Sequence, residues 1–488
     1  MTVMHRSVSP SSLHGPESDP SETAPPVLAP DVLRGVADDV MRWTEADTTN
    51  VFVEHSAIGM TRVARGRVRM QESGDALSIM IWTAYGQRAG VSLRVDQLDE
   101  RVLRRAVAYL DTTARQASGD PAPRSLPFPP RHYLPGAVWK PTTAVAFTDT
   151  RHAAVFELVA PVLAAGLLPA AMVGVYAASK VHVSKAGITA MGWETDAEIA
   201  VTARHLTVRG QGWAGQAARN WSALSPAHVA DRAVEIARRS ANPVAFEPGR
   251  RTVILDRPAV AALVNAMAET FDATYNFIGR TPLQDRATGK PKLNQLVMDP
   301  RMTLRSDPHD PDGGYLPFDG EGYPRVPMTW IDKGILANLA YRTDYAAQRG
   351  YPEPNSVTRS MRLTGPASPA KSPPTVEEMI KQCKEAVYVN RIAYIEPIFD
   401  DPYAGTMTGV TTGGCFLIRD GQIVKPIKDF RFRDSPWTAL NTRLEAVGTS
   451  ERAAFGYAPW AGQWPIEPAI VPPLMIRDFN FTAMSDAI

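Results

Sequence analysis

The hydrophobic pattern of the first 245 residues predicts the same order of elements twice: a helix, a group of strands and a second helix. Apolar residues at helical spacing predict four helices, over 30–46, 98–117, about 151–167 and 224–241. Period-two alternation predicts the strands between them, over 50–57, 60–73 and 76–94, and then from about 171 to 210. Asp99 is placed to cap the second helix, and Ser225 with Pro226 the fourth. A repeat of about 125 residues is too long for a solenoid and indicates a duplicated α/β unit.

From about residue 245 the pattern changes to short strands separated by Gly, Pro and Asp turns. Two helices interrupt it: 255–277, with a start signal at Asp256 and Pro258, and 375–387, with a capping box formed by Thr375 and Glu378. We therefore expect an α+β fold with three parts: a disordered lead-in over 1–30, an N-terminal α/β-type domain over 31–245 and a β-rich C-terminal domain over 246–488. The first domain contains two similar halves, 31–118 and 150–245, built as a mixed sheet with helices and joined by a proline-rich connector.

The apolar helix 255–277 carries four polar residues through its middle: Asn265, Glu269, Thr270 and Asp272. Residues three and four apart are neighbours on a helix, so these side chains adjoin the apolar face. A solvated face, the edge of an active site and the remains of one all fit this pattern.

Composition narrows the choice of compartment and partner. The chain has 488 residues, 44% hydrophobic and 21% charged, which predicts a globular protein of two or three domains. Its 52 basic and 51 acidic residues leave a net charge of +1, so nothing indicates a nucleic-acid binder. Only two cysteines occur, Cys383 and Cys415, which excludes a disulfide framework and favours the cytoplasm. The apolar stretch 154–180 is interrupted by Glu157, Pro161 and Pro169, so a buried helix and strand are expected there rather than a membrane span.

Familiar catalytic motifs are absent from the sequence. No phosphate-binding Gly-rich loop or G-x-S-x-G motif occurs, and no two of the nine histidines have helical zinc-pair spacing. The acidic stretch 306–314 lacks the calcium-loop spacing and is predicted to be a solvated turn. Cys415 could line a cleft, but no adjacent base activates it.

The stretch 411–440 is the most distinctive, with Gly413–Gly414 before an apolar strand and a hairpin turn at Asp420–Gly421. Upstream lie the block Phe318-Asp319-x-Glu321-Gly322 and a second hairpin turn at 332–334. Together with the helix start "VILDRPAVAALV", these blocks resemble the TldD/PmbA metallopeptidase family, and the likeness covers roughly residues 31–482.

The resemblance gives the helix 255–277 a meaning. In active TldD-like subunits this helix carries H-E-x-x-x-H, whose histidines bind zinc and whose glutamate is the general base, and a downstream cysteine is a further ligand. This sequence has Asn265, Ala266 and Thr270 at the matching positions, and no cysteine follows Cys415. Asn and Thr are poor zinc ligands and Ala cannot move a proton. The resemblance thus points to the PmbA-like (TldE-like) branch, which lacks the motif.

The expected function is that of a zinc-less, non-catalytic partner subunit in a cytoplasmic peptidase that processes unfolded or precursor peptides, including natural-product precursors. We expect no catalytic residue, metal or cofactor in this chain, zinc only in a TldD-like partner, a heterodimer or self-dimer, and neither nucleic acid nor membrane as partner. Candidate cleft and peptide-binding residues are Glu269, Asp272, Asp319, Glu321, Gly413, Gly414 and Cys415. Two alternatives remain: a stand-alone enzyme with non-zinc or relocated chemistry, which would use carboxylates of this set or Cys415, and a homo-oligomeric peptide-binding or scaffold protein.

Overall fold

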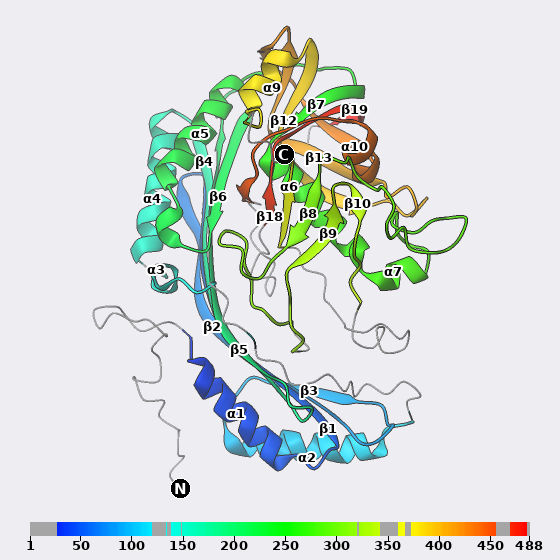
Figure 1. Ribbon diagram of the computed structural model, residues 1–488. Helices are drawn as coiled ribbons and strands as arrows, with labels where there is room; N and C mark the ends of the chain where they lie inside the picture. The colour runs from blue at the N-terminus through cyan, green and yellow to red at the C-terminus, as the bar shows by residue number, and fades with distance from the viewer. Residues whose placement is uncertain are drawn as a thin grey trace.

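The N-terminal part is built on one sheet of very long, curved strands (Figure 1). The computed structural model describes residues 27–119, 133, 138–147, 149–319, 322–341, 360–366, 372–454 and 469–485. The sheet has the order β3-β2-β1-β4-β5-β6. Its strands are β1 (Thr48–Ala64), β2 (Arg67–Ala84), β3 (Val91–Val95), β4 (Leu168–Ser184), β5 (Thr189–Arg204) and β6 (Gln211–Ala218).

Every pairing in this first sheet is antiparallel, so the expected mixed sheet is wrong. Turns connect consecutive strands within each half, and such connections force antiparallel neighbours. The two halves then meet where β1 pairs with β4. The sequence analysis predicted separate strands over 50–57, 60–73 and 76–94, and these bounds are also wrong. Strands β1 and β2 are each continuous, and the chain turns between them at Arg65–Gly66, where φ is positive (54° and 69°).

The main helices of this part cover one face of the sheet. They are α1 (Pro30–Trp43), α2 (Glu100–Gln116), α4 (Asp149–Ala164) and α5 (Pro226–Arg239); short turns α3 (Pro141–Ala144) and η2 (Trp221–Ala223) lie nearby. Val51 and Val53 of β1 pack under α1 and α2, while Val63 of the same strand packs under α4 and α5. These odd-numbered positions share a face because side chains alternate along a strand. Burial of β1 follows that alternation over most of its length.

The second unit packs on the opposite, concave face of the sheet (Figure 1). Its strands β12 (Glu385–Pro397), β7 (Gly249–Leu255), β19 (Leu474–Ser485), β15 (Asp429–Asp434) and β13 (Met407–Arg419) follow one another, and β13 pairs back to β12. The sheet therefore closes into a small barrel, which removes its edges. Four fully buried aromatic rings fill one side: Phe430, Phe432, Phe479 and Phe481.

A second, smaller sheet of this unit lies beside the barrel, in the order β10-β9-β8-β11-β18-β17. Its strands are β8 (Thr303–Ser306), β9 (Met328–Asp332), β10 (Ile335–Leu336), β11 (Met361–Thr364), β17 (Glu451–Ala453) and β18 (Ala469–Val471). The remaining elements of the unit are α6 (Arg257–Ala268), η3 (Glu269–Phe271), α7 (Ala273–Phe277), α9 (Val376–Gln382), β14 (Gln422–Pro426), α10 (Pro436–Thr442) and β16 (Leu444–Val447). The α+β fold class is confirmed.

The sequence predicted most helix starts and turns correctly, but it predicted the lengths of the elements less accurately. Asp99 caps α2 and Thr375 forms the predicted capping box of α9. Ser225 makes no side-chain cap to α5, and α9 ends at Gln382, because Cys383 is already extended (φ −87°, ψ 130°). The return strand expected after Gly421 is split into β14 and β15.

The structure can be compared with two further predictions, the disordered lead-in over 1–30 and the buried helix and strand over 154–180. Residues 1–26 of the expected lead-in lie outside the described residues, whereas Val27 is fully buried. The stretch 154–180 is divided between α4, which continues through Pro161, and β4. Among the described residues, no helix has both the length and the apolar character needed to span a membrane.

Candidate functional site

The helix that raised the question of a metal site is held between the barrel and the smaller sheet. Helix α6 packs against β12 on one side and β11, β17 and β18 on the other. Asp256 caps it by accepting the Arg257 N–H at 2.8 Å, and its other carboxylate oxygen accepts the Tyr388 hydroxyl at 2.5 Å. The apolar face is buried to 2% exposure or less, with Val260, Leu263 and Met267 inside the main core. This packing fixes where residues 265–272 lie.

Residues 255–277 do not form one helix, which corrects the sequence expectation. Helix α6 ends at Ala268, a 3-10 turn covers Glu269–Phe271, and α7 starts anew at Ala273. The break follows from Asp272, which is extended (φ −65°, ψ 119°) and accepts the Thr274 N–H at 2.8 Å as the cap of α7. An Asp that bonds its neighbouring backbone competes with helix continuation. Asp272 is therefore a capping residue, while Glu269 is exposed on the 3-10 turn.

The three residues that the family resemblance sets at the zinc ligand and base positions do not fit zinc. Asn265 is half-buried, and its Oδ1 atom is buried without a hydrogen-bond partner among the described residues. The Thr270 hydroxyl donates to the Met267 carbonyl oxygen at 2.5 Å, and Ala266 offers only a methyl group packed against the core. Zinc sites use thiolate, imidazole or carboxylate ligands, and this trio has none. Within the described part of the chain, no group of three or more His, Cys, Asp or Glu side chains could hold a metal ion.

Asp319 lies in a loop that packs against the first sheet. Its Oδ1 accepts the Tyr323 N–H at 2.9 Å, which closes a tight turn. In this loop Gly322 is pressed against β4: an added Cβ would come within 2.6 Å of the His182 ring. Phe318 packs with Ala190 of β5. Asp319 thus belongs to the contact between the two units, and Glu321 lies outside the described residues.

Gly413 and Gly414 lie where β13 meets the first unit. Both have positive φ (72° and 127°), and an added Cβ would come within 2.8 Å of Trp213 Cβ or 2.7 Å of Ile236 Cγ2, respectively. Asn390 joins the strands here, because its Nδ2 donates to the carbonyl oxygens of Trp213 (2.9 Å) and Gly413 (2.8 Å). Only glycine allows such close approach of a backbone in this conformation. The pair therefore serves the contact between the units instead of offering a free edge to a peptide.

Cys415 lines a cleft of about 340 Å³ between the two units, on the side of the barrel that faces the β5–β6 turn. Burial raises the pKa of its thiol well above the usual value, so the thiolate is disfavoured. Asp429 lines the same cleft and accepts the Thr411 hydroxyl at 3.1 Å. Burial raises the pKa of Asp429 to about 7. Arg204, His205, Arg209 and Lys428 also line the cleft, so most of its ionisable side chains are basic.

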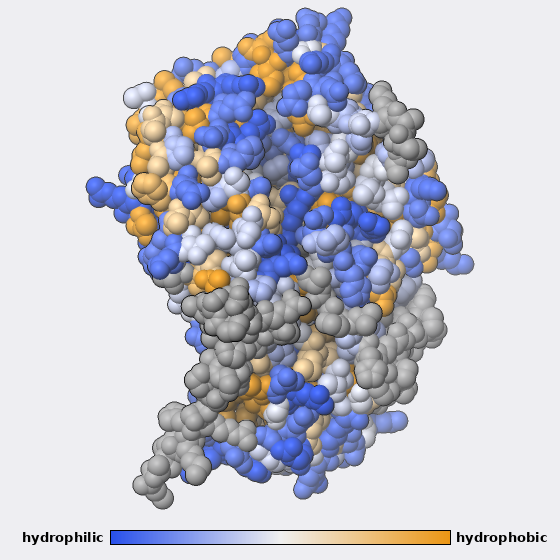
Figure 2. Space-filling view, turned by 60° about the vertical axis from the view of Figure 1, so that its left-hand side comes forward, coloured by the Kyte–Doolittle hydropathy of each residue, from blue (hydrophilic) through white to orange (hydrophobic). Residues whose placement is uncertain are grey.

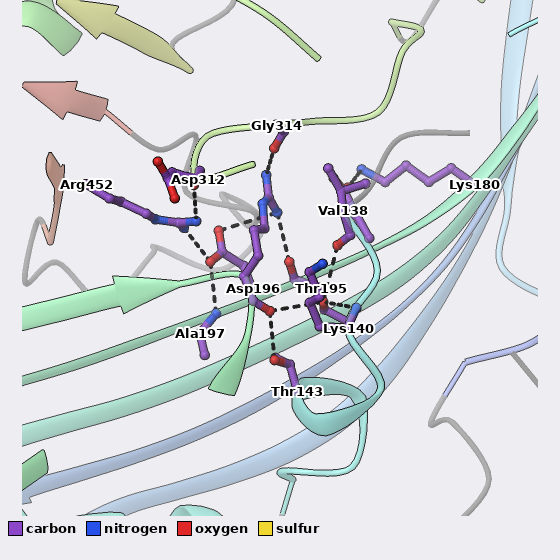
Figure 3. A network of polar contacts seen from close by, with 12 residues as sticks. Val138, Lys140, Thr143, Lys180, Thr195, Asp196, Ala197, Asp312, Gly314 and Arg452 are labelled. Atoms are coloured by element: carbon purple, nitrogen blue, oxygen red, sulfur yellow. Dashed lines mark hydrogen bonds and ion pairs between the residues drawn. The ribbon is translucent and has the colours of Figure 1, made fainter. Parts of the chain in front are cut away.

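The sequence analysis missed a buried ionic network on the concave face of the first sheet (Figure 3). Asp196 of β5, 2% exposed, accepts Arg452 Nη2 at 2.6 Å, and its other oxygen lies 3.5 Å from Arg219 Nη1. Arg219 also donates to the carbonyl oxygens of Thr195 (2.9 Å) and Gly314 (2.7 Å).

A second ion pair belongs to the same face of β5. Lys180 Nζ lies 2.7 Å from the buried carboxylate of Glu194 and 3.6 Å from Glu54. The signal that could have revealed the network is the period-two series Glu194, Asp196, Glu198 within an apolar strand, because acidic side chains on one face of a buried strand need partners.

Comparison with known proteins now decides the family. Residues 248–483 match the family model "PmbA/TldA metallopeptidase C-terminal domain", a range that runs from β7 to β19 and contains α6 and the Gly413–Gly414 pair. Residues 248–483 belong to the PmbA/TldD family. The resemblance noted in the sequence is thereby confirmed at the family level.

A curated relative of this chain is a metalloprotease from Archaeoglobus fulgidus, 23% identical over 208 residues. That match covers 40% of this chain, and the chain spans only 45% of the length of the relative. Among solved structures, TldE from Thermococcus kodakarensis superposes with a TM-score of 0.75 at 16% identity, covering 93% of this chain and 99% of that one. A proposed modulator of DNA gyrase from Thermotoga maritima gives 0.76 at 14% identity, covering 92% and 100%. At these identities the structures establish a shared PmbA/TldD fold over nearly the whole chain.

Proposed function

We propose that this chain is the zinc-less subunit of a cytoplasmic PmbA/TldD-family peptidase, in which a TldD-like partner performs the zinc chemistry. The observation that supports the proposal is the donor set of α6 and the 3-10 turn after it, where the family resemblance sets Asn265, Ala266 and Thr270 at the ligand, base and ligand positions. The sequence has no histidine after His309 and no cysteine after Cys415, so the imidazole and thiolate ligands of the family's zinc site have no replacement downstream of these positions.

The substrate class that follows from the family is an unfolded or precursor peptide, including a precursor of a peptide natural product. This chain would form part of the wall of the peptide chamber. Among the candidate peptide-binding residues named from the sequence, Glu269, at the end of α6, is exposed and could contact a peptide there. The fold shared with TldE supports this role, because the match covers 99% of that structure and 93% of this chain.

Co-expression with a homologue that carries H-E-x-x-x-H tests the proposal. We expect the two chains to co-purify, zinc to be present at one ion per TldD-like chain, and peptide cleavage to require both chains. Replacing the glutamate of the partner motif should abolish cleavage without dissolving the complex. Stoichiometric zinc in this chain alone, or failure to form a complex, would sink the proposal, since metal binding needs ligands that α6 lacks.

One observation favours a second candidate, an activity of the chain alone that does not depend on zinc. A carboxyl group that titrates near neutrality can serve as a general acid or base, and Asp429 combines a pKa of about 7 with a place in the cleft beside Cys415. Such an activity would persist in chelator and disappear in Asp429→Asn. Loss of all activity on chelation contradicts this candidate.

A further inference from the structure

Both units contribute cationic side chains to the cleft that Asp429 lines. Arg204, His205 and Arg209 come from the end of β5 and the turn after it, whereas Lys428 directly precedes β15 of the barrel. Arginine and lysine keep their charge at neutral pH, so three of these side chains are permanently positive. The Asp429 carboxyl group is only partly ionised there, because its pKa is about 7. The residues that line the cleft therefore carry a surplus of positive charge.

Hydrogen bonds hold the basic turn against the second unit. His205 Nε2 lies 2.8 Å from the Ala237 carbonyl oxygen at the end of α5, so this ring nitrogen carries a proton and donates it. Arg204 Nη2 donates to Gln211 Oε1 at 3.1 Å, and Gln211 Nε2 donates to the Thr412 hydroxyl of β13 at 3.3 Å. A site whose groups are already ordered loses less entropy when a ligand binds. The cleft is in this sense prepared for a ligand that contacts both units.

The rest of the lining suits an organic group. Val208, Pro243 and Ile427 supply apolar surface, and Ser240 and Ser485 supply hydroxyl groups. The cleft has about 340 Å³, which lies within the usual range of roughly 300–1,000 Å³ for small-molecule sites and exceeds the needs of a bare ion. The barrel and α5 lie in the upper half of Figure 1, and at that height Figure 2 shows a hollow with mostly hydrophilic residues around it.

We propose that the cleft binds a small organic molecule that carries a phosphate group, with the phosphate at the basic side chains and the organic part against Val208 and Ile427. A phosphate ester carries a charge of about −1.5 to −2 at neutral pH, and arginine offers N–H groups in a fork that matches its oxygens. A monocarboxylate has a single charge and binds the same cations less tightly. The proposal is independent of the zinc-less subunit role, because it uses neither α6 nor a TldD-like partner.

Calorimetric titration of the isolated chain with phenyl phosphate tests the proposal. We expect one molecule bound per chain, weaker binding of inorganic phosphate, which lacks the organic part, and weaker binding of benzoate, which has a carboxylate instead. Arg204→Gln/Arg209→Gln should raise the dissociation constant about ten-fold or more, because hydrogen bonds to a charged group are lost, and Lys428→Gln on the other unit should raise it too. Both arginines are exposed, so folding should be preserved. The matched control Arg67→Gln/Arg69→Gln removes the same charge from exposed positions of β2 outside the cleft and should bind like wild type.

Asp429 gives the site a pH dependence that basic residues on an open surface do not have. Its ionised carboxylate repels a bound anion, so the affinity of wild type for phenyl phosphate should fall as pH rises through about 7. Asp429→Asn lacks this repulsion, so it should bind more tightly than wild type at about pH 8 and equally at about pH 6. The other ionisable groups that line the cleft are the same in both proteins: Cys415 of β13, Lys428 before β15, and Arg204, His205 and Arg209 of the β5–β6 turn.

Five results would each overturn the proposal. They are no saturable binding of phenyl phosphate at millimolar concentration, unchanged binding in Arg204→Gln/Arg209→Gln, an equal loss in the control pair, inorganic phosphate or benzoate binding as tightly as phenyl phosphate, and equal affinities of wild type and Asp429→Asn at about pH 8. None of them bears on the zinc-less subunit role, which is tested by complex formation and cleavage with the partner chain.

Discussion

Replacing Asp429 by asparagine should stabilise the protein at neutral and alkaline pH and leave its stability nearly unchanged below pH 4. The carboxyl group lies in the cleft between the units, where burial raises its pKa from 3.8 to about 7. The folded state therefore holds this proton more tightly than the unfolded state, and the free energy of unfolding falls as pH rises from about 4 through about 7. One pKa unit corresponds to about 1.4 kcal/mol, so the titration is worth up to ~4 kcal/mol above pH 8. Asparagine keeps an acceptor for the Thr411 hydroxyl and removes the titration.

Urea unfolding of wild type and Asp429→Asn at several pH values between 4 and 8 measures this difference. Asp299→Asn is the control of opposite sign, because hydrogen bonds from Arg301 lower the pKa of Asp299. Its carboxylate stabilises the fold above the unfolded pKa of 3.8, and that contribution is lost as pH falls through the lowered folded value. Asp299→Asn should thus destabilise the protein at neutral pH. If the curves of wild type and Asp429→Asn run parallel from pH 4 to 8, Asp429 is not a buried titrating group.

Two further substitutions test the contact between the units. Gly413→Ala should cost ~2 kcal/mol more unfolding free energy than Gly166→Ala, which has nearly the same φ (72° against 73°) but nothing within 4 Å of the added Cβ, whereas Gly413 faces Trp213 at 2.8 Å. Equal losses would show that Trp213 moves aside freely. Asp196→Asn leaves Arg219 and a second guanidinium buried without their counter-charge and should cost ~3–5 kcal/mol in the same urea assay. A loss below about 1 kcal/mol would mean that water already screens the network.

Features set by neighbouring residues could be predicted from the sequence. The caps at Asp99, Asp256 and Thr375 satisfy helix N–H groups within three positions, so their meaning is local. The turns at Asp420–Gly421 and Lys333–Gly334 take positive φ values, as such turns require. The family blocks also lie within short windows, which is why the fold could be inferred from them.

Features that depend on residues far along the chain could not be read in this way. The Gly413–Gly414 pair looked like an edge for a peptide, because nothing in the sequence places Trp213 against it. The break after Ala268 was hidden by an apolar period that continues to Phe271, while the decisive bond is the cap made by Asp272. Strand lengths were underestimated, because pairing on both sides of β1 holds residues extended where their own pattern weakens.

The distribution of buried polar groups bears on whether the chain has chemistry of its own. An active site keeps polar groups preorganised toward a substrate instead of toward each other. Most buried charges here satisfy one another: Asp196 with two arginines, Glu194 with Lys180, and Asp310 with Arg362 at 2.6 Å. Of these pairs, the one between Asp196 of β5 and Arg452 of β17 joins the two units.

Asn265 of the α6 region and Asp429 of the cleft depart from that rule, and they separate the candidate functions. Asn265 leaves a buried oxygen without a partner, at a position where zinc chemistry would need histidine. Asp429 is a buried carboxyl that accepts the Thr411 hydroxyl and titrates near neutrality. A zinc-free activity in this cleft would use the Asp429 carboxyl, so that Asp429→Asn would gain stability and lose that function together. If that variant becomes more stable while peptide cleavage by the two-chain complex is unchanged, the chemistry resides in the partner.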